Sequence, residues 1–185
     1  MKYGRFYLAW IAGNLIGFMV GSVMGATSNG LVPALVPGFI GLVCGDLIFG
    51  LAIGLAQWRV LRSTNINVFL PGWLFASSIG FMLGARLGSL LTYRLVADWL
   101  PAHIVFGIFM GTCIGLATTL PLSRIIAWPK LIGWIVISIP AWVLGESIAF
   151  ASEFAQAYVP VIAISISALT GLELLRLQRP KPVDL

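Results

Sequence analysis

Charge is scarce in this chain: Asp, Glu, Lys and Arg together make up 9% of its 185 residues, whereas hydrophobic residues make up 59%. An ordinary soluble domain carries about 25% charged residues, because its surface has to be hydrated. So low a charge content excludes a soluble globular domain. It predicts an integral membrane protein that crosses the bilayer several times.

Histidine, cysteine and the residue patterns of known enzymes are equally scarce. The chain has a single His, His103, and two Cys, Cys44 and Cys113. Both cysteines fall inside apolar runs, at depths that differ by about 12 Å, which is too far for a disulfide. The sequence contains no GxSxG, HExxH, CxxC or Walker pattern. We therefore predict no enzymatic activity, no cofactor and no metal site.

Apolar runs of about 20 residues, the length that a helix needs to cross a bilayer, occur six times. The alternating strand pattern of closed membrane barrels is absent. The predicted fold is therefore all-α, with one transmembrane domain of six helices over residues 1–185. The predicted spans are Phe6–Ala26, Val36–Trp58, Phe69–Leu91, Ala102–Leu122, Leu131–Ala151 and Tyr158–Leu177.

Internal repeats relate these spans in pairs. Trp73–Gly88 repeats Trp10–Gly25, with the Trp, the tetrapeptide IGFM and further glycines in register. Gly50–Ala56 returns as Gly111–Ala117, and a fainter copy lies in Thr170–Arg179. Self-similarity at a fixed period indicates a repeated structural unit. We therefore predict three tandem two-helix hairpins with pseudo-threefold symmetry, at about residues 5–62, 67–124 and 128–179.

Lys and Arg are concentrated on one side of the predicted bundle. Arg94 alone lies on the other side, and Arg86 lies inside the third span. Cytoplasmic loops of membrane proteins carry an excess of Lys and Arg. We therefore predict cytoplasmic termini and a location in the inner or an internal cell membrane. The same distribution accounts for the net charge of +5 without a nucleic-acid partner. The residues on the predicted cytoplasmic side are Lys2, Arg5, Arg59, Arg62, Arg124, Lys130, Arg176, Arg179 and Lys181.

Glycine recurs every fourth residue within several spans. Such a row forms a smooth stripe on one helix face, where a neighbouring helix can approach closely. We interpret the rows as packing surfaces between helices of one chain or of an oligomer, with a pore lining or a cofactor surface as the alternative. The packing residues predicted in this way are Gly17, Gly21, Gly80, Gly84, Gly88, Gly107, Gly111 and Gly115.

Tryptophan lies mainly at the predicted cytoplasmic ends of the spans. Amphipathic indole rings prefer the depth of the lipid headgroups, so this pattern predicts an interfacial belt. We expect His103, at the opposite end of the fourth span, to be interfacial as well. The belt comprises Trp10, Trp58, Trp73, Trp128 and Trp134.

Three ionisable residues fall at one predicted depth inside the membrane: Asp46, Arg86 and Glu146. Counted from the Trp at the cytoplasmic end of each span, all three lie about 18 to 20 Å into a core about 30 Å thick. Facing lipid would be costly, so we expect them to face the bundle interior and each other. Because one Arg cannot neutralise two acids, the layer is a structural ion-pair layer, contains a protonated acid, or binds a cation or basic ligand. Glu173 and Arg176 are expected to form a local pair.

One segment carries a resemblance. GLAQWRVLR, from Gly54 to Arg62, resembles the QWxVLR element of small multi-span membrane proteins of cyanobacteria and related bacteria. The resemblance implies a multi-span membrane protein and implies no activity. The layout of three hairpins looks like that of the mitochondrial carriers, whose PxDxxK signature this chain lacks.

Two functions fit these observations. The chain is a transporter or channel for a small solute or ion, with the charged layer as its site, or it is a non-transporting accessory or assembly subunit that docks through its glycine-rich faces. Beyond the lipid bilayer, the sequence leaves open a homo-oligomer or a larger membrane complex as partner.

Overall fold

The computed structural model describes residues 3–25, 30–64, 66, 68–95, 99–151 and 158–178. These residues form seven helices and no strand. The helices are α1 (Tyr3–Met24), α2 (Leu31–Leu35), α3 (Gly38–Leu61), α4 (Leu70–Leu95), α5 (Trp99–Leu122), α6 (Trp128–Ala151) and α7 (Tyr158–Gln178).

Six of these helices, all but α2, are long and apolar enough to cross a membrane. This confirms the predicted all-α fold with six spans and supports a multi-pass membrane protein. The threefold repeat and its symmetry stay predictions. Proline occupies the first turn of four long helices, where its missing N–H leaves no hydrogen bond unmade. These prolines are Pro71, Pro101, Pro129 and Pro160.

The helix α2 was not expected from the sequence. It is five residues long, contains Pro33, and packs mainly against α3. A segment of this length is too short for a hydrophobic period to become visible.

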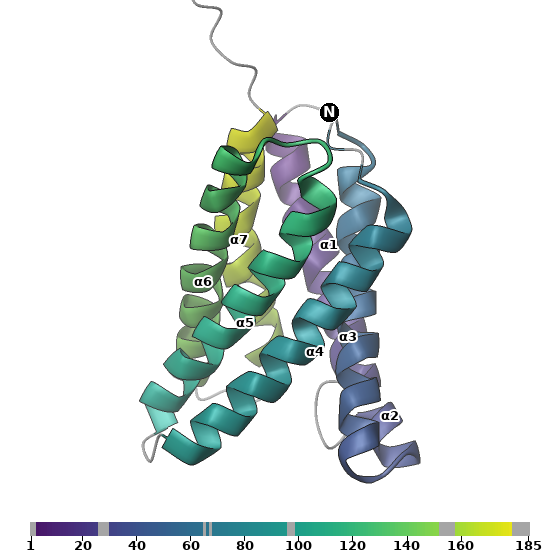
Figure 1. The fold of residues 1–185 in the computed structure, drawn as a ribbon, viewed down its shortest axis with the longest axis vertical. Coiled ribbons are helices and arrows are strands. Elements are labelled where there is room, and N and C mark those ends of the chain that lie inside the picture. Colours follow the sequence, from purple (N-terminus) through teal and green to yellow (C-terminus); the bar gives the residue numbers. More distant parts are fainter. Residues whose placement is uncertain are drawn as a thin grey trace, which may run out of the picture.

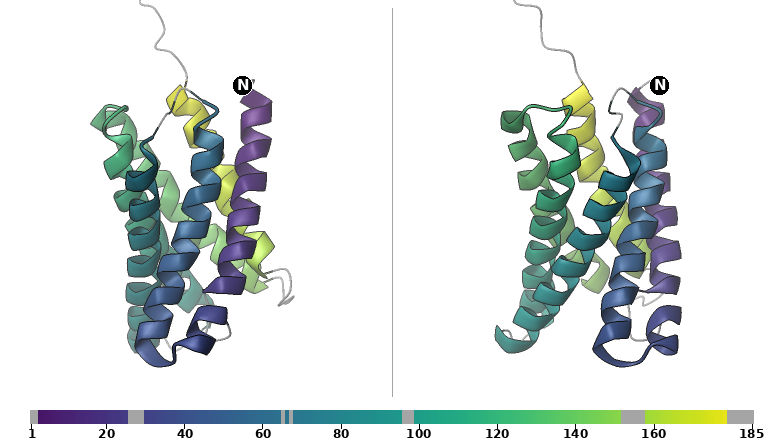
Figure 2. Two further views of the ribbon diagram at one scale, coloured as in Figure 1. Left: turned by 90° about the vertical axis from the view of Figure 1, so that its right-hand side faces the viewer. Right: turned by 45° about the vertical axis from the view of Figure 1, so that its right-hand side comes forward.

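The six long helices form a closed ring. Each helix packs against the helices before and after it in the chain, and α7 closes the ring by packing against α1. The chain enters α1 and leaves α7 at the same end of the bundle, here called the terminal end (Figure 1). At the opposite or distal end, α4 and α5 lean away from α3 (Figures 1 and 2).

Glycines bring each helix close to the next one in the ring. Gly17 of α1 faces Ile53 of α3, and Gly50 of α3 faces Ser77 and Ser78 of α4. Gly80, Gly84 and Gly88 of α4 all face α5, and Gly107, Gly111 and Gly115 of α5 all face α6. The series continues with Gly21 against Phe49, Gly145 against Ile162 and Ile166, and Gly171 against Tyr7 and Trp10. The glycine rows are therefore covered by helices of the same chain.

Near the terminal end, the interior of the ring is filled with large apolar side chains. Trp10 and Trp73 are fully buried, and Trp134 is 3% exposed. The expectation that these three residues belong to an interfacial belt is wrong, because their rings point into the bundle. Trp128, at 56% exposure, does lie on the surface. The cluster consists of Phe6, Trp10, Leu61, Ile66, Val68, Trp73, Leu122, Leu131, Trp134, Leu174 and Leu177.

Candidate functional site

A cavity of about 260 Å³ lies inside the distal half of the ring. All six long helices contribute to its wall, and the wall contains each of the three ionisable residues that the sequence places at one depth: Asp46, Arg86 and Glu146. We call it the charged cavity. Its other lining residues are Phe18, Ser22, Phe49, Phe81, Ala85, Ser89, Phe106, Met110, Trp142, Tyr158, Val159 and Ile162.

Arg86 of α4 and Asp46 of α3 form an ion pair across one side of this cavity. Arg86 Nε lies 2.6 Å from Asp46 Oδ2. Asp46 is buried, whereas the Arg86 side chain is 23% exposed. Arg86 faces α3 because it lies about 200° around α4 from Gly84, which faces α5. The glycine row thus sets the direction of the arginine.

Glu146 of α6 has different partners. Its Oε2 atom accepts a hydrogen bond of 2.5 Å from the Tyr158 hydroxyl and lies 3.3 Å from His103 Nδ1. The imidazole of His103 also stacks on the ring of Phe150, with centroids 4.5 Å apart. His103 therefore contacts the buried acid directly, and its interfacial depth stays a prediction.

A second hollow adjoins the charged cavity on its distal side. It shares Glu146, Tyr158, Ser89 and Phe106 with the charged cavity and adds three residues nearer the distal ends of α4 and α5. These residues are Thr92, Ala102 and His103. The charged cavity thus continues toward the distal end of the bundle.

Four aromatic side chains close the charged cavity on its terminal side. Phe49 stacks on Phe81 at 4.3 Å between centroids, Phe81 lies 6.1 Å from Trp142, and Phe18 lies 5.7 Å from Trp142 and 5.5 Å from Phe49. Each ring therefore contacts two of the other three, and the four rings form a closed cycle. We call this group, which comes from α1, α3, α4 and α6, the aromatic layer.

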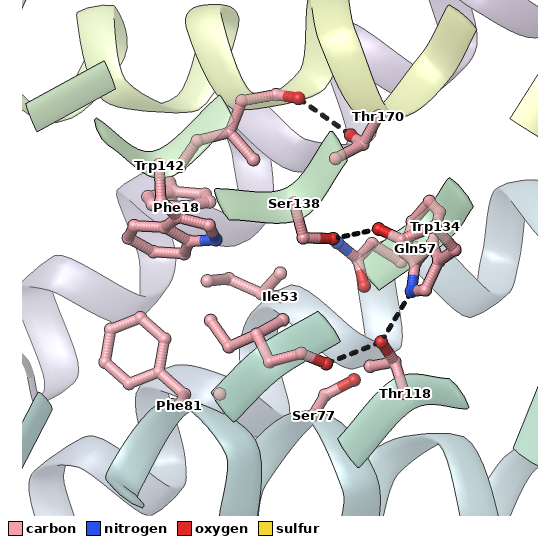
Figure 3. A pocket seen from close by; sticks show the side chains of 13 residues that line it. Phe18, Ile53, Gln57, Ser77, Phe81, Thr118, Trp134, Ser138, Trp142 and Thr170 are labelled. Carbon is pink, nitrogen blue, oxygen red and sulfur yellow. Dashed lines mark hydrogen bonds between the residues drawn. The ribbon is translucent and has the colours of Figure 1, made fainter. Parts of the chain in front are cut away.

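A smaller polar cavity of about 30 Å³ lies on the terminal side of the aromatic layer. Figure 3 shows Phe18, Phe81 and Trp142 on one side of this space and Gln57 and Trp134 on the other. Its volume is enough for about one water molecule. The hydroxyl groups that line it are those of Ser77, Thr118, Ser138 and Thr170.

Most polar groups of the small cavity have partners on the helices. Trp134 Nε1 donates to Thr118 Oγ1 over 2.9 Å, and the Ser138 hydroxyl donates to the Trp134 carbonyl over 2.7 Å. Ser77 Oγ is buried and has no hydrogen-bond partner among the described residues. A buried hydroxyl of this kind needs a partner that enters the cavity, such as water.

His103 and Tyr158 are site residues that the sequence reasoning missed. A signal for them was present. Tyr158 is the first residue of α7 and His103 lies in the second turn of α5, whereas Glu146 lies near the end of α6. Since α6 runs opposite to both neighbours, these three positions share one depth. Counting from the distal helix ends would have placed them together.

Potential metal ligands are not clustered in the part of the chain that the structure describes. No cluster of three or more His, Cys, Asp or Glu side chains is found there. Cys44 and Cys113 are free, half-buried thiols on separate helices.

No protein-family model, curated protein or solved structure matches this chain.

Proposed function

We propose that this membrane protein is a small transporter or channel for a small solute, with its binding site in the charged cavity. The observation that carries the proposal is a cavity on the inside of a closed helix ring that is lined by charged groups from three different helices, of which Asp46 and Glu146 are buried. Buried ionisable groups are costly in a membrane and usually belong to a substrate or ion pathway. If the ring had only a structural role, apolar side chains in place of these charged groups would often make it equally stable or more stable.

The proposed path runs along the inside of the ring. It leads from the distal hollow through the charged cavity, past the aromatic layer, to the small polar cavity. The apolar cluster around Trp10, Trp73 and Trp134 then seals the terminal end. A solute in the charged cavity would cross only if the aromatic layer and this seal open. With cytoplasmic termini, the charged cavity faces the outside.

The alternative role, an accessory or assembly subunit, relied on glycine-rich faces as docking surfaces. Gly17, Gly84 and Gly111 each face another helix of the same chain, so these faces are already occupied. A docking role would need a different surface. We also propose no enzymatic activity, since the sequence carries no GxSxG, HExxH, CxxC or Walker pattern.

Cysteine labelling tests the proposed path. After Cys44 and Cys113 are replaced by Ala, single cysteines are introduced by Ser89→Cys in the charged cavity and Ser77→Cys in the polar cavity. Leu83→Cys, on the lipid-facing side of α4, is the control. A membrane-impermeant thiosulfonate is added to oriented vesicles from either side.

We expect Ser89→Cys to react from the distal side and Ser77→Cys to react from the terminal side in an open state. Leu83→Cys should stay unlabelled. Labelling at Ser89→Cys alone would indicate a binding pocket without transport, and labelling at neither cavity position would overturn the proposal.

A further inference from the structure

The charges of the charged cavity do not cancel. Asp46 is paired with Arg86 at 2.6 Å, whereas Glu146 contacts a hydroxyl and an imidazole. His103 carries a charge only when it is protonated. With Glu146 ionised and His103 neutral, the charged groups that line the cavity leave one net negative charge, which belongs to Glu146. Such a cavity attracts a cation and repels an anion.

The walls of the cavity decide which kind of cation fits. Aromatic rings surround the space on several sides, from Phe18, Phe49, Phe81, Phe106, Trp142 and Tyr158. Ring faces attract an ammonium ion through the cation–π interaction, and they shield its alkyl groups from water. A metal ion that sheds its water shell needs about six oxygen ligands, far more than this largely apolar wall offers.

Trp142 and Glu146 are four residues apart on α6, so they lie on one face of that helix. Both line the cavity, and Tyr158 donates to Glu146 from the neighbouring α7. Both contacts that the described residues make to this carboxylate fall on Oε2. The other oxygen, Oε1, is the one available to a bound cation, with the indole ring one turn away.

We propose that the charged cavity binds a small organic ammonium ion, with its charged nitrogen between Glu146 and Trp142 and its alkyl part against Phe106 and Met110. The volume of about 260 Å³ lies just below the usual range for ligand pockets, which suits a compound of few heavy atoms. This inference rests on the proposed function, since it names the solute class of the same site.

The test compares three probes of the same shape. Choline carries a trimethylammonium group, 3,3-dimethyl-1-butanol carries the neutral tert-butyl group in its place, and 3,3-dimethylbutanoate carries a negative charge. Binding to the purified full-length protein in detergent at pH 8 is measured by tryptophan fluorescence. We expect choline to bind at least tenfold more tightly than the neutral isostere and the anion not to bind.

Variants assign the effect to the site. Glu146→Gln should abolish the preference for choline, and Trp142→Leu should weaken choline binding about tenfold. Glu173→Gln is the matched control, because Glu173 pairs with Arg176 at the terminal end of α7, away from the cavity. If Glu146→Gln does not fold, Trp142→Leu and the comparison of probes still decide the question.

Equal binding of choline and its neutral isostere would overturn the inference, and so would preferential binding of the anion. The cysteine labelling described above separates the two proposals. A labelled Ser89→Cys together with no preference for choline overturns the ammonium site alone, whereas an unlabelled cavity overturns the path as well.

Discussion

At the scale of single residues, the buried acids of this membrane protein differ in what neutralises them. Asp46 has a full positive charge beside it, while Glu146 has a hydroxyl and a histidine. Removing one partner of a buried ion pair leaves an uncompensated charge, which costs about 3 to 5 kcal/mol. The two acids should therefore respond differently to the loss of Arg86.

We predict that Arg86→Gln lowers the free energy of unfolding by about 3 to 5 kcal/mol, since it leaves the buried carboxylate of Asp46 unpaired. The double variant with Asp46→Asn should recover much of this loss. The free energies are measured by denaturant titration in mixed micelles.

The double variant of Arg86→Gln with Glu146→Gln is the control and should not recover, because Glu146 is held by Tyr158 and His103. Recovery in the double variant with Glu146→Gln, but not in the one with Asp46→Asn, would mean that Arg86 pairs with Glu146 instead of Asp46.

The three buried tryptophans near the terminal end offer a second comparison. Trp10 Nε1 donates to Thr170 Oγ1 over 3.1 Å and Trp134 Nε1 donates to Thr118 Oγ1, whereas Trp73 Nε1 has no hydrogen-bond partner among the described residues. Trp→Phe should therefore cost about 0.5 to 1.5 kcal/mol more at Trp10 and Trp134 than at Trp73. Thermal unfolding of the three variants in detergent measures the difference. Equal losses of stability at all three positions would show that the cost of Trp→Phe comes from the lost ring volume and not from the hydrogen bond.

At the scale of helices, Gly84 is the sharpest test of the close packing. A Cβ atom at this position would lie 2.9 Å from Cα of Met110 in α5, so the backbones would have to separate. We predict that Gly84→Ala destabilises the protein by about 1 to 3 kcal/mol. Melting in detergent, followed by fluorescence, measures the loss.

Gly72→Ala, on the same helix, is the matched control for Gly84→Ala. Its nearest neighbour would lie 3.5 Å away, which is ordinary contact. This variant should be neutral or slightly stabilising, because Ala favours a helix more than Gly does. If both variants melt alike, α4 and α5 are not in close contact along this row.

Hydropathy was sufficient to predict the six long helices, because a span must present about 20 apolar residues to lipid whatever its neighbours are. It missed α2, which is short and packs on α3. It could not separate a buried Trp from an interfacial one either. Trp73 and Trp128 both lie near the terminal end of a helix, and only the rotation of that helix buries the first and exposes the second.

The site was predictable to a similar degree. Counting residues from the helix ends brought Asp46, Arg86 and Glu146 to one depth, and the structure lines one cavity with them. Depth does not fix rotation about the helix axis. The rotation of neighbouring helices decides which acid Arg86 contacts. It also decides that Glu146 contacts Tyr158.

At the scale of the whole molecule, the distribution of Lys and Arg predicts orientation. Arg59 and Arg176 lie in the last turns of α3 and α7, whereas Arg94 lies in the last turn of α4, at the other end. We predict that reporter fusions after Arg62 and Lys130 indicate the cytoplasm. Fusions near Asn29, Asp98 and Glu153, which lie outside the described residues, should indicate the opposite side. A cytoplasmic signal at these three positions would contradict the predicted orientation.

Because α7 packs against α1 and closes the ring, the fold depends on the order of the helices around the ring more than on which helix comes first in the chain. Tyr7 of α1 donates to the Ala168 carbonyl of α7 over 3.2 Å, and α1 begins and α7 ends at the terminal end of the bundle. A linker could therefore join these ends while new ends are cut between α5 and α6. This circular permutant, which would begin at α6, should insert, close and melt like the parent, although its first and last helices are different ones.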